Sequence, residues 1–155
     1  MKGEGRRFNV VGKGNGIRRM SKAKTRHTGG CGCGAIRYRI DEAPLSSGIC
    51  HCQTCRKVAS APTLPFVTFP VRTLVYEQGA PRAFASSKGV VRTFCGSCGS
   101  PLGYQNDADP GLIDIMTVSL DEPDEYHPTF HVWTSEKVSW DVICDNLPAH
   151  PKSRP

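Results

Sequence analysis

The chain has 155 residues, a hydrophobic content of 38%, eight cysteines and a formal net charge of +6. This length is typical of one domain, and the modest apolar content predicts that bound metal contributes to the free energy of folding. No apolar stretch reaches the length of a membrane-spanning helix, and the first thirty residues lack the apolar run of a secretory signal, so we expect a cytoplasmic protein with reduced thiols.

The positive charge is concentrated at the start of the chain. Residues 1–27 hold nine Lys or Arg and one Glu, a net of +8, so the other 128 residues carry −2. This basic extension has few apolar anchors and is expected to be disordered. One interpretation is an arm that binds nucleic acid, and the other is an unselected extension ahead of a natural start at Met20. We favour the second, because runs of charge are usually solvated.

The domain itself is predicted over residues 28–150, with residues 151–155 as a C-terminal tail. Cys31 and Cys33 lie among the glycines of residues 29–34, which allow the backbone to wrap tightly around a metal. Residues 35–40 alternate apolar with charged side chains, as a half-buried strand does. This strand is expected to end at residues 41–44.

The densest group of thiols follows, in the sequence ICHCQTCRK at residues 49–57. In an extended segment Cys50 and Cys52 face the same side, and a turn through residues 53–54 then brings Cys55 to the same metal. His51 faces the opposite side in that conformation, which favours a surface or supporting imidazole over a ligand. Arg56 and Lys57 place positive charge beside the thiols, either to bind a substrate carboxylate or simply as solvated groups.

The middle of the chain predicts short strands. Residues 61–76 are rich in aromatic and β-branched side chains interrupted by prolines, and Phe66 and Phe69 are expected in the core rather than in a substrate cleft. Residues 83–94 form a hairpin with its turn at Lys88 and Gly89. Its second strand leads directly to Cys95.

The sequence CGSCG at residues 95–99 is typical of a zinc knuckle, in which Cys95 and Cys98 meet one ion. A redox-active pair has the same spacing, but no helical pattern follows and the other cysteine groups remain to be explained. Strands are expected over residues 100–104, 112–120 and 131–134. The strand at residues 112–120 is expected to be central in the sheet. Cys144 is expected to be a buried free thiol, and no helical period of ten residues or more occurs.

The eight cysteines divide into a pair, a triple, a pair and one alone. The two pairs together provide the four thiolates of a closed structural zinc site, and the triple provides three ligands and an open fourth position, as in a catalytic zinc site. Four disulfides are the alternative, but spacings of one or two residues favour chelation.

Four segments in this order resemble the glutathione-dependent formaldehyde-activating enzyme family, also called the CENP-V/GFA domain family. They are GCGCGAIRY at residues 30–38, CHCQTCRK at 50–57, FCGSCGSPL at 94–102 and HVWT at 131–134. The resemblance covers residues 28–150 and implies a β-tent fold of short antiparallel strands with two zinc ions. It implies a structural site made by Cys31, Cys33, Cys95 and Cys98, and a catalytic site made by Cys50, Cys52 and Cys55.

The activity implied by the resemblance is that of a carbon-sulfur lyase, which joins glutathione to formaldehyde as S-(hydroxymethyl)glutathione. Arg56 and Lys57 are the residues expected to meet a glutathione carboxylate. The alternative is a non-catalytic module that stores zinc, or that the basic extension carries to nucleic acid.

Overall fold

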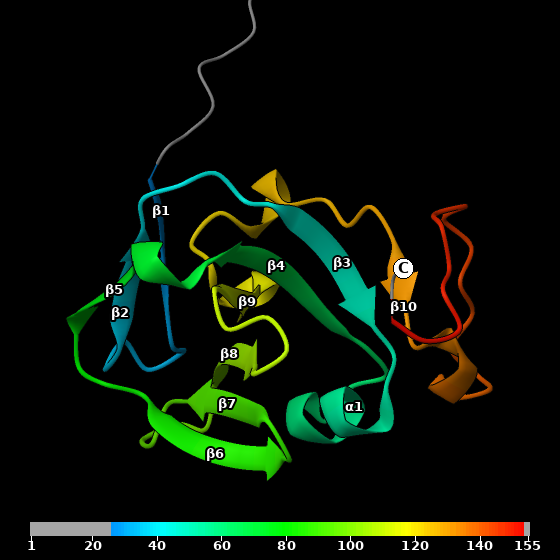
Figure 1. Ribbon diagram of the computed structural model, residues 1–155, viewed down its shortest axis with the longest axis horizontal. Helices are drawn as coiled ribbons and strands as arrows, with labels where there is room; N and C mark the ends of the chain where they lie inside the picture. Colours follow the sequence, from blue (N-terminus) through cyan, green and yellow to red (C-terminus); the bar gives the residue numbers. More distant parts are fainter. Residues whose placement is uncertain (1–25, 154–155) are drawn as a thin grey trace, which may run out of the picture.

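The computed structural model describes residues 26–153, in which ten strands form two sheets with one α-helix and four 3₁₀ helices (Figure 1). The prediction of a mainly β fold with little helix is confirmed. The first strand, β1, begins at His27, one residue ahead of the expected domain start. The expectations for residues 1–25, including the disordered basic arm, lie outside the described residues.

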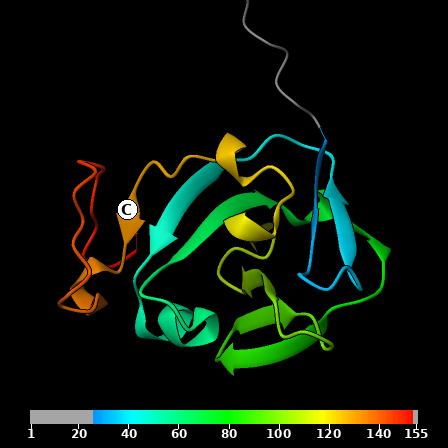
Figure 2. The ribbon, with the colours of Figure 1, turned by 180° about the vertical axis from the view of Figure 1, so that it is seen from behind.

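The smaller sheet has three antiparallel strands in the order β1-β2-β5. Its strands are β1 (His27–Gly30), β2 (Arg37–Ile40) and β5 (Leu74–Gln78). In Figure 1 this sheet stands to the left of the larger one, and Figure 2 shows the same arrangement from behind.

The larger sheet has seven strands in the order β10-β3-β4-β9-β8-β7-β6. Its strands are β3 (Ser46–Cys50), β4 (Leu64–Pro70), β6 (Arg82–Ser87), β7 (Val90–Phe94), β8 (Pro101–Asn106), β9 (Leu112–Met116) and β10 (His131–Val132). All its pairs are antiparallel except β10 with β3. The expectation of purely antiparallel pairing is therefore corrected at this one edge.

The period-two alternation of the strands separates two hydrophobic clusters. On β4, Val67 and Phe69 belong to one cluster, whereas Leu64 and Phe66 belong to the other. The first cluster lies between the two sheets and includes Cys31 and Cys95. The second lies on the opposite face of β4 and includes Cys50 and Cys55. Each predicted group of metal ligands is thus attached to its own cluster.

One α-helix, α1 (Gln53–Ala59), connects β3 to β4 where only a turn was expected. The Cys52 sulfur caps its first turn by accepting a hydrogen bond from the Cys55 backbone N–H, at 3.3 Å. The Glu136 carboxylate, from a distant segment, accepts a second one from the Gln53 N–H at 2.7 Å. A helix this short has no strong periodic signal and depends on such tertiary caps.

The central strand and the last strand are shorter than expected. β9 lies in the middle of the larger sheet, as predicted, but ends at Met116 instead of continuing to residue 120. β10 contains two residues, because Trp133 has left-handed backbone dihedrals (φ 59) that end the strand. The 3₁₀ helices are η1 (Val71–Thr73), η2 (Thr117–Ser119), η3 (Pro123–Glu125) and η4 (Thr134–Glu136).

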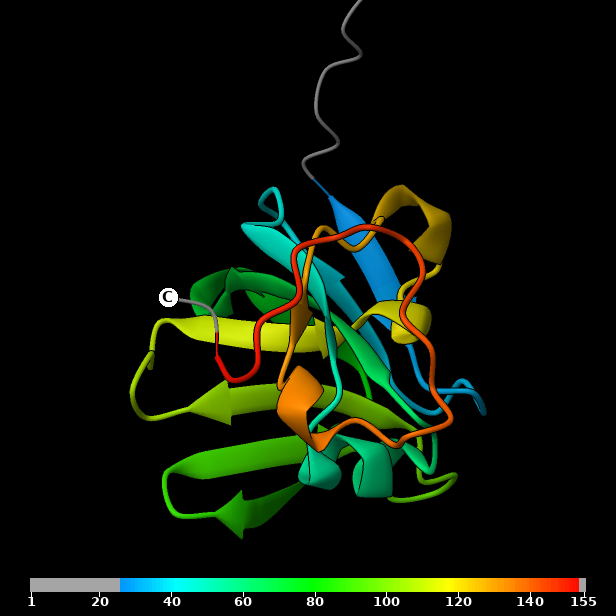
Figure 3. The ribbon, with the colours of Figure 1, turned by 90° about the vertical axis from the view of Figure 1, so that its right-hand side faces the viewer.

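The C-terminal segment beyond η4 runs as an irregular loop in front of β10 (Figure 3, orange to red). It returns alongside β10 through a parallel bridge between His131 and Ala149. Cys144 lies in this loop and is exposed, so the prediction of a buried thiol is wrong. The apolar residues around it form no strand, and their side chains therefore do not enter either cluster.

Candidate metal centres and the adjoining cavity

Four cysteine sulfurs from two distant turns converge at one end of the core. The turn between β1 and β2 carries Cys31 and Cys33, and the turn between β7 and β8 carries Cys95 and Cys98. All four sulfurs lie within 4.8 Å of one another. Cys31 and Cys95 are buried, whereas Cys33 and Cys98 are exposed.

The two turns have matching local structures. Gly34 and Gly99 both adopt left-handed dihedrals (φ 76 and 77), which lets the chain reverse just after each cysteine pair. Backbone N–H groups point at the buried sulfurs, from Ile36 to Cys31 at 3.3 Å and from Ser97 to Cys95 at 3.4 Å. Such N–H···S contacts stabilise negative charge on a thiolate.

The sulfur distances agree with a tetrahedral zinc site. The Cys31 and Cys33 sulfurs are 3.5 Å apart, and those of Cys33 and Cys95 are 3.8 Å apart. Four sulfurs placed at about 2.3 Å from one ion are separated by about 3.8 Å, so the donor set fits zinc in both chemistry and spacing. Hydrogen bonds from the Ser100 hydroxyl and backbone lower the pKa of Cys98 to about 5, whereas at Cys33 the Ala35 N–H is outweighed by the neighbouring thiols of Cys31 and Cys98, which raise the pKa of Cys33 to about 11.

The second cluster is formed by one continuous segment. Cys50 is the last residue of β3, Cys52 caps α1 and Cys55 lies in its first turn, so strand and helix turn the three sulfurs toward one point, within 4.8 Å of one another. The hydrogen bond between the first two thiols, the largest influence on each, raises the pKa of Cys50 and lowers that of Cys52. Three soft donors without a fourth protein ligand in the described residues fit zinc with an open position.

All three of these cysteines line a cavity of about 380 Å³. Its walls are largely apolar, and its polar members come mainly from the larger sheet and from η4. The lining residues used below are Leu64, Phe66, Arg92, Tyr104, Asp114, Met116, Trp133 and Glu136. Phe69 is fully buried in the core, as expected, whereas Phe66 both packs against the second hydrophobic cluster and lines the cavity.

A row of polar side chains crosses this face of the larger sheet. The strand registers place Arg92 opposite Tyr104, Tyr104 opposite Asp114, and Asp114 opposite Thr68. Thr68 donates a hydrogen bond to Asp114 at 2.7 Å and accepts one from Ser46 at 3.0 Å. Burial raises the pKa of Asp114 and also that of Tyr104.

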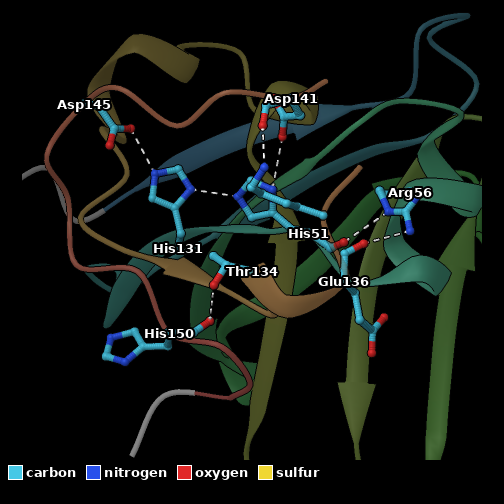
Figure 4. A network of polar contacts seen from close by, with 9 residues as sticks. His51, Arg56, His131, Thr134, Glu136, Asp141, Asp145 and His150 are labelled. Atoms are coloured by element: carbon cyan, nitrogen blue, oxygen red, sulfur yellow. Dashed lines mark hydrogen bonds and ion pairs between the residues drawn. The ribbon is translucent and has the colours of Figure 1, made fainter. Parts of the chain in front are cut away.

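His51 is buried and lies in a network of polar contacts with residues of β10 and of the segment that follows it (Figure 4). Its Nε2 lies 2.8 Å from His131 Nδ1, and His131 Nε2 lies 2.9 Å from an Asp145 oxygen. Asp141 is 3.2 Å from His51 Nδ1, without hydrogen-bond geometry. His51 belongs to neither sulfur cluster and is a supporting residue rather than a surface one, and the chain of contacts attaches the C-terminal loop to β3 and β10.

Arg56 and Lys57 do not line the cavity. The Arg56 guanidinium donates to the backbone carbonyls of His51 and Glu136, at 3.1 and 2.9 Å, and so connects α1 to η4 (Figure 4). The predicted contact of Arg56 and Lys57 with a glutathione carboxylate remains a prediction.

The cation that does line the cavity is Arg92, which our sequence analysis missed. Its Nη2 donates to the Cys55 sulfur at 3.4 Å across 37 residues of chain. The only signal in the sequence was a charged residue inside an otherwise uncharged strand that leads to Cys95.

The comparisons with known proteins place these features in a family. Residues 26–136, more than half of the chain, match the glutathione-dependent formaldehyde-activating enzyme family. A protein of Schizosaccharomyces pombe, described as an uncharacterized lyase, is 36% identical over 92 residues, which cover 57% of this chain and 65% of the relative. The chain therefore spans a little less than two thirds of that relative.

A crystal structure of a Rhodobacter sphaeroides protein shares the fold. Its TM-score is 0.53 at 21% identity, with coverage of 61% of this chain and 87% of that one. Within residues 26–153 no helix is both long and apolar enough to cross a membrane. Taken with the ordered cysteine turns, the match over residues 26–136 shows that the chain belongs to the glutathione-dependent formaldehyde-activating enzyme family.

Proposed function

We propose that the protein is a zinc-dependent carbon-sulfur lyase that joins a thiol such as glutathione to an aldehyde such as formaldehyde. Membership of the family and the lyase description of the S. pombe relative support this reaction class. In this proposal Cys31, Cys33, Cys95 and Cys98 hold a structural zinc, and Cys50, Cys52 and Cys55 hold the reactive one. The reduced thiols that both sites require suit a cytoplasmic location.

The observation that carries the proposal is the unequal surroundings of the two sulfur clusters. The three-cysteine cluster lines the cavity of about 380 Å³, and none of the five other cysteines does. Cys50, Cys52 and Cys55 would hold the zinc through three thiolates, and such an ion would supply an open position suited to a substrate thiolate. The cavity provides the space beside that position for the aldehyde carbon.

The reaction needs no redox change. The substrate thiol first releases its proton to solvent, its sulfur then forms a bond to the carbonyl carbon while the π electrons of C=O move to the oxygen, and the resulting alkoxide takes a proton from water. Cleavage of the adduct is the reverse. The chain's own task is to hold the sulfur, place the carbonyl next to it and favour the alkoxide.

Zinc stoichiometry of the purified, reduced protein tests the assignment. We expect two zinc ions per chain, of which one is removed easily and changes its affinity when excess glutathione is added, because only that ion has an open position. Cysteinylglycine, which keeps the thiol but lacks the γ-glutamyl group, serves as the comparison thiol. Turnover is then measured as formation of the formaldehyde adduct above the uncatalysed rate.

A single tightly bound zinc that does not respond to either thiol would contradict the proposal. The chain would then be a non-catalytic zinc module, and its basic extension would become the first place to look for a function.

A further inference from the structure

Arg92 is a buried cation placed directly beside the proposed reactive site. The residue is only 6% exposed, and it lines the cavity together with Cys50, Cys52 and Cys55. Among the residues that line this cavity it is the only Lys or Arg. A charged group is rarely buried to this extent unless it has partners, so the hydrogen bonds of Arg92 need to be accounted for.

Most of its hydrogen-bonding capacity is unused within the described residues. A guanidinium has five N–H donors, and only Nη2 has a hydrogen-bond acceptor, the Cys55 sulfur at 3.4 Å. Nε is buried without any acceptor. A buried, cationic group with free donors at the wall of a cavity is suited to bind an oxygen atom of a ligand.

The surroundings hold the guanidinium in place. Its central carbon lies 4.8 Å from the centroid of the Tyr104 ring, a cation–π contact that fixes one face of the group. The next residue in the row, Asp114, is half-buried and forms its hydrogen bond with Thr68 rather than with Arg92. Arg92 is therefore oriented by the sheet and by Cys55 without being neutralised by a direct carboxylate partner.

We propose that Arg92 binds the oxygen atom carried by the carbon that is attached to the substrate sulfur. The inference rests on the function proposed above and adds the group that recognises the aldehyde-derived half of the adduct. During addition the C–S bond forms, the C=O π bond breaks, and Arg92 donates N–H to the developing alkoxide without losing its proton. During cleavage the same contact stabilises the alkoxide from which the thiolate departs.

A pair of small probes isolates this contact by binding, without turnover. Thioacetate carries an oxygen on the carbon bonded to sulfur, as the adduct does, and ethanethiol lacks it. We measure the Kd of each for the zinc-loaded full chain by calorimetry, in wild type, Arg92→Met and Arg92→Lys. The ratio of the two Kd values within one variant cancels changes that affect the sulfur alone.

We expect Arg92→Met to lower the preference for thioacetate over ethanethiol by about tenfold to hundredfold, the usual range for losing a hydrogen bond to a charged group. Arg92→Lys keeps the charge but not the planar fork, so it should restore only part of the preference. Arg72→Met is the matched control. Arg72 lies on η1, is exposed and forms an ion pair with Glu42, so its replacement should leave the ratio of the two Kd values unchanged.

The outcomes separate the two proposals. Equal ratios in wild type and Arg92→Met, with both probes bound, would overturn the role of Arg92 and leave the lyase proposal standing. Failure of both probes to bind the two-zinc wild type would overturn the lyase proposal and this inference with it. Loss of one zinc from Arg92→Met, with wild-type ratios in Arg92→Lys, would show that the cation serves the thiolates and not the oxygen.

Discussion

Gly48 illustrates how closely single residues are fitted around the three-cysteine segment. A Cβ at this position of β3 would lie 2.5 Å from Cε2 of the Phe130 ring, which packs in the same cluster as Cys50. We expect Gly48→Ala to lower the free energy of unfolding by about 1–3 kcal/mol, because the ring must move out of a packed cluster. Denaturant unfolding of the zinc-loaded protein measures this change.

Gly111→Ala is the control for that substitution. No heavy atom lies within 4 Å of a Cβ built there, so we expect little change in stability. Equal destabilisation by the two substitutions would mean that the Phe130 contact is not what requires glycine at position 48.

Residues that are close in sequence were predictable, and those brought together by the sheet were not. The cysteines could be grouped because chelating spacings of one or two residues are local. The contact of Arg92 with Cys55 depends instead on the registers of β7, β8, β9 and β4, which no spacing reveals. Cys144 was expected to be buried because the other seven cysteines already filled the two zinc sites, but having no metal to bind does not place a thiol in the core, and Cys144 is exposed.

At the scale of elements, α1 depends on the segment that follows β10. Glu136 in η4 accepts a hydrogen bond from the Gln53 N–H with its carboxylate and one from Arg56 with its backbone carbonyl. We expect Glu136→Ala to destabilise the first turn of α1 by about 0.5–2 kcal/mol, the usual cost of losing such a cap. Since Cys55 lies in that turn, the more labile zinc should bind more weakly, as a chelator competition would show.

Glu136→Gln separates the hydrogen bond from the charge. Its side-chain oxygen can still accept from the Gln53 N–H, so we expect zinc affinity close to that of wild type. If glutamine weakened zinc binding as much as alanine does, the carboxylate would act through its charge at the cavity and not as a cap.

The elements themselves were predicted as far as local patterns extend. Alternation located most strands, and Gly89 (φ 74) forms the turn of the expected hairpin between β6 and β7. Local sequence patterns did not predict the parallel pairing of β10 with β3 or the helical conformation of residues 53–59. Both depend on contacts with residues 130–150, which are remote in sequence.

At the scale of the whole molecule, the four-cysteine cluster connects a turn of the smaller sheet to a turn of the larger sheet. Cys33 follows β1 of the smaller sheet, and Cys95 follows β7 of the larger sheet. The two residues are 62 positions apart in sequence. A metal held there closes a long loop and fastens one sheet to the other, whereas the three-cysteine cluster spans only six positions. Closing the longer loop removes more conformational freedom from the unfolded chain, so the two ions should differ in their contribution to stability.

Stepwise removal of zinc tests this difference at the scale of the whole fold. With increasing chelator we expect one zinc to leave first with little change in far-UV circular dichroism, because the short three-cysteine segment loses only a local constraint. The second should leave together with cooperative unfolding, since a structural zinc contributes about 10 kcal/mol or more to folding.

Cys52→Ser should fold with one zinc and show only the second step, whereas Cys98→Ser should unfold at much lower denaturant concentration. Equal loss of stability in the two variants would contradict the division into a structural and a reactive site. That division requires folding to depend on the four-cysteine site and not on the three-cysteine site.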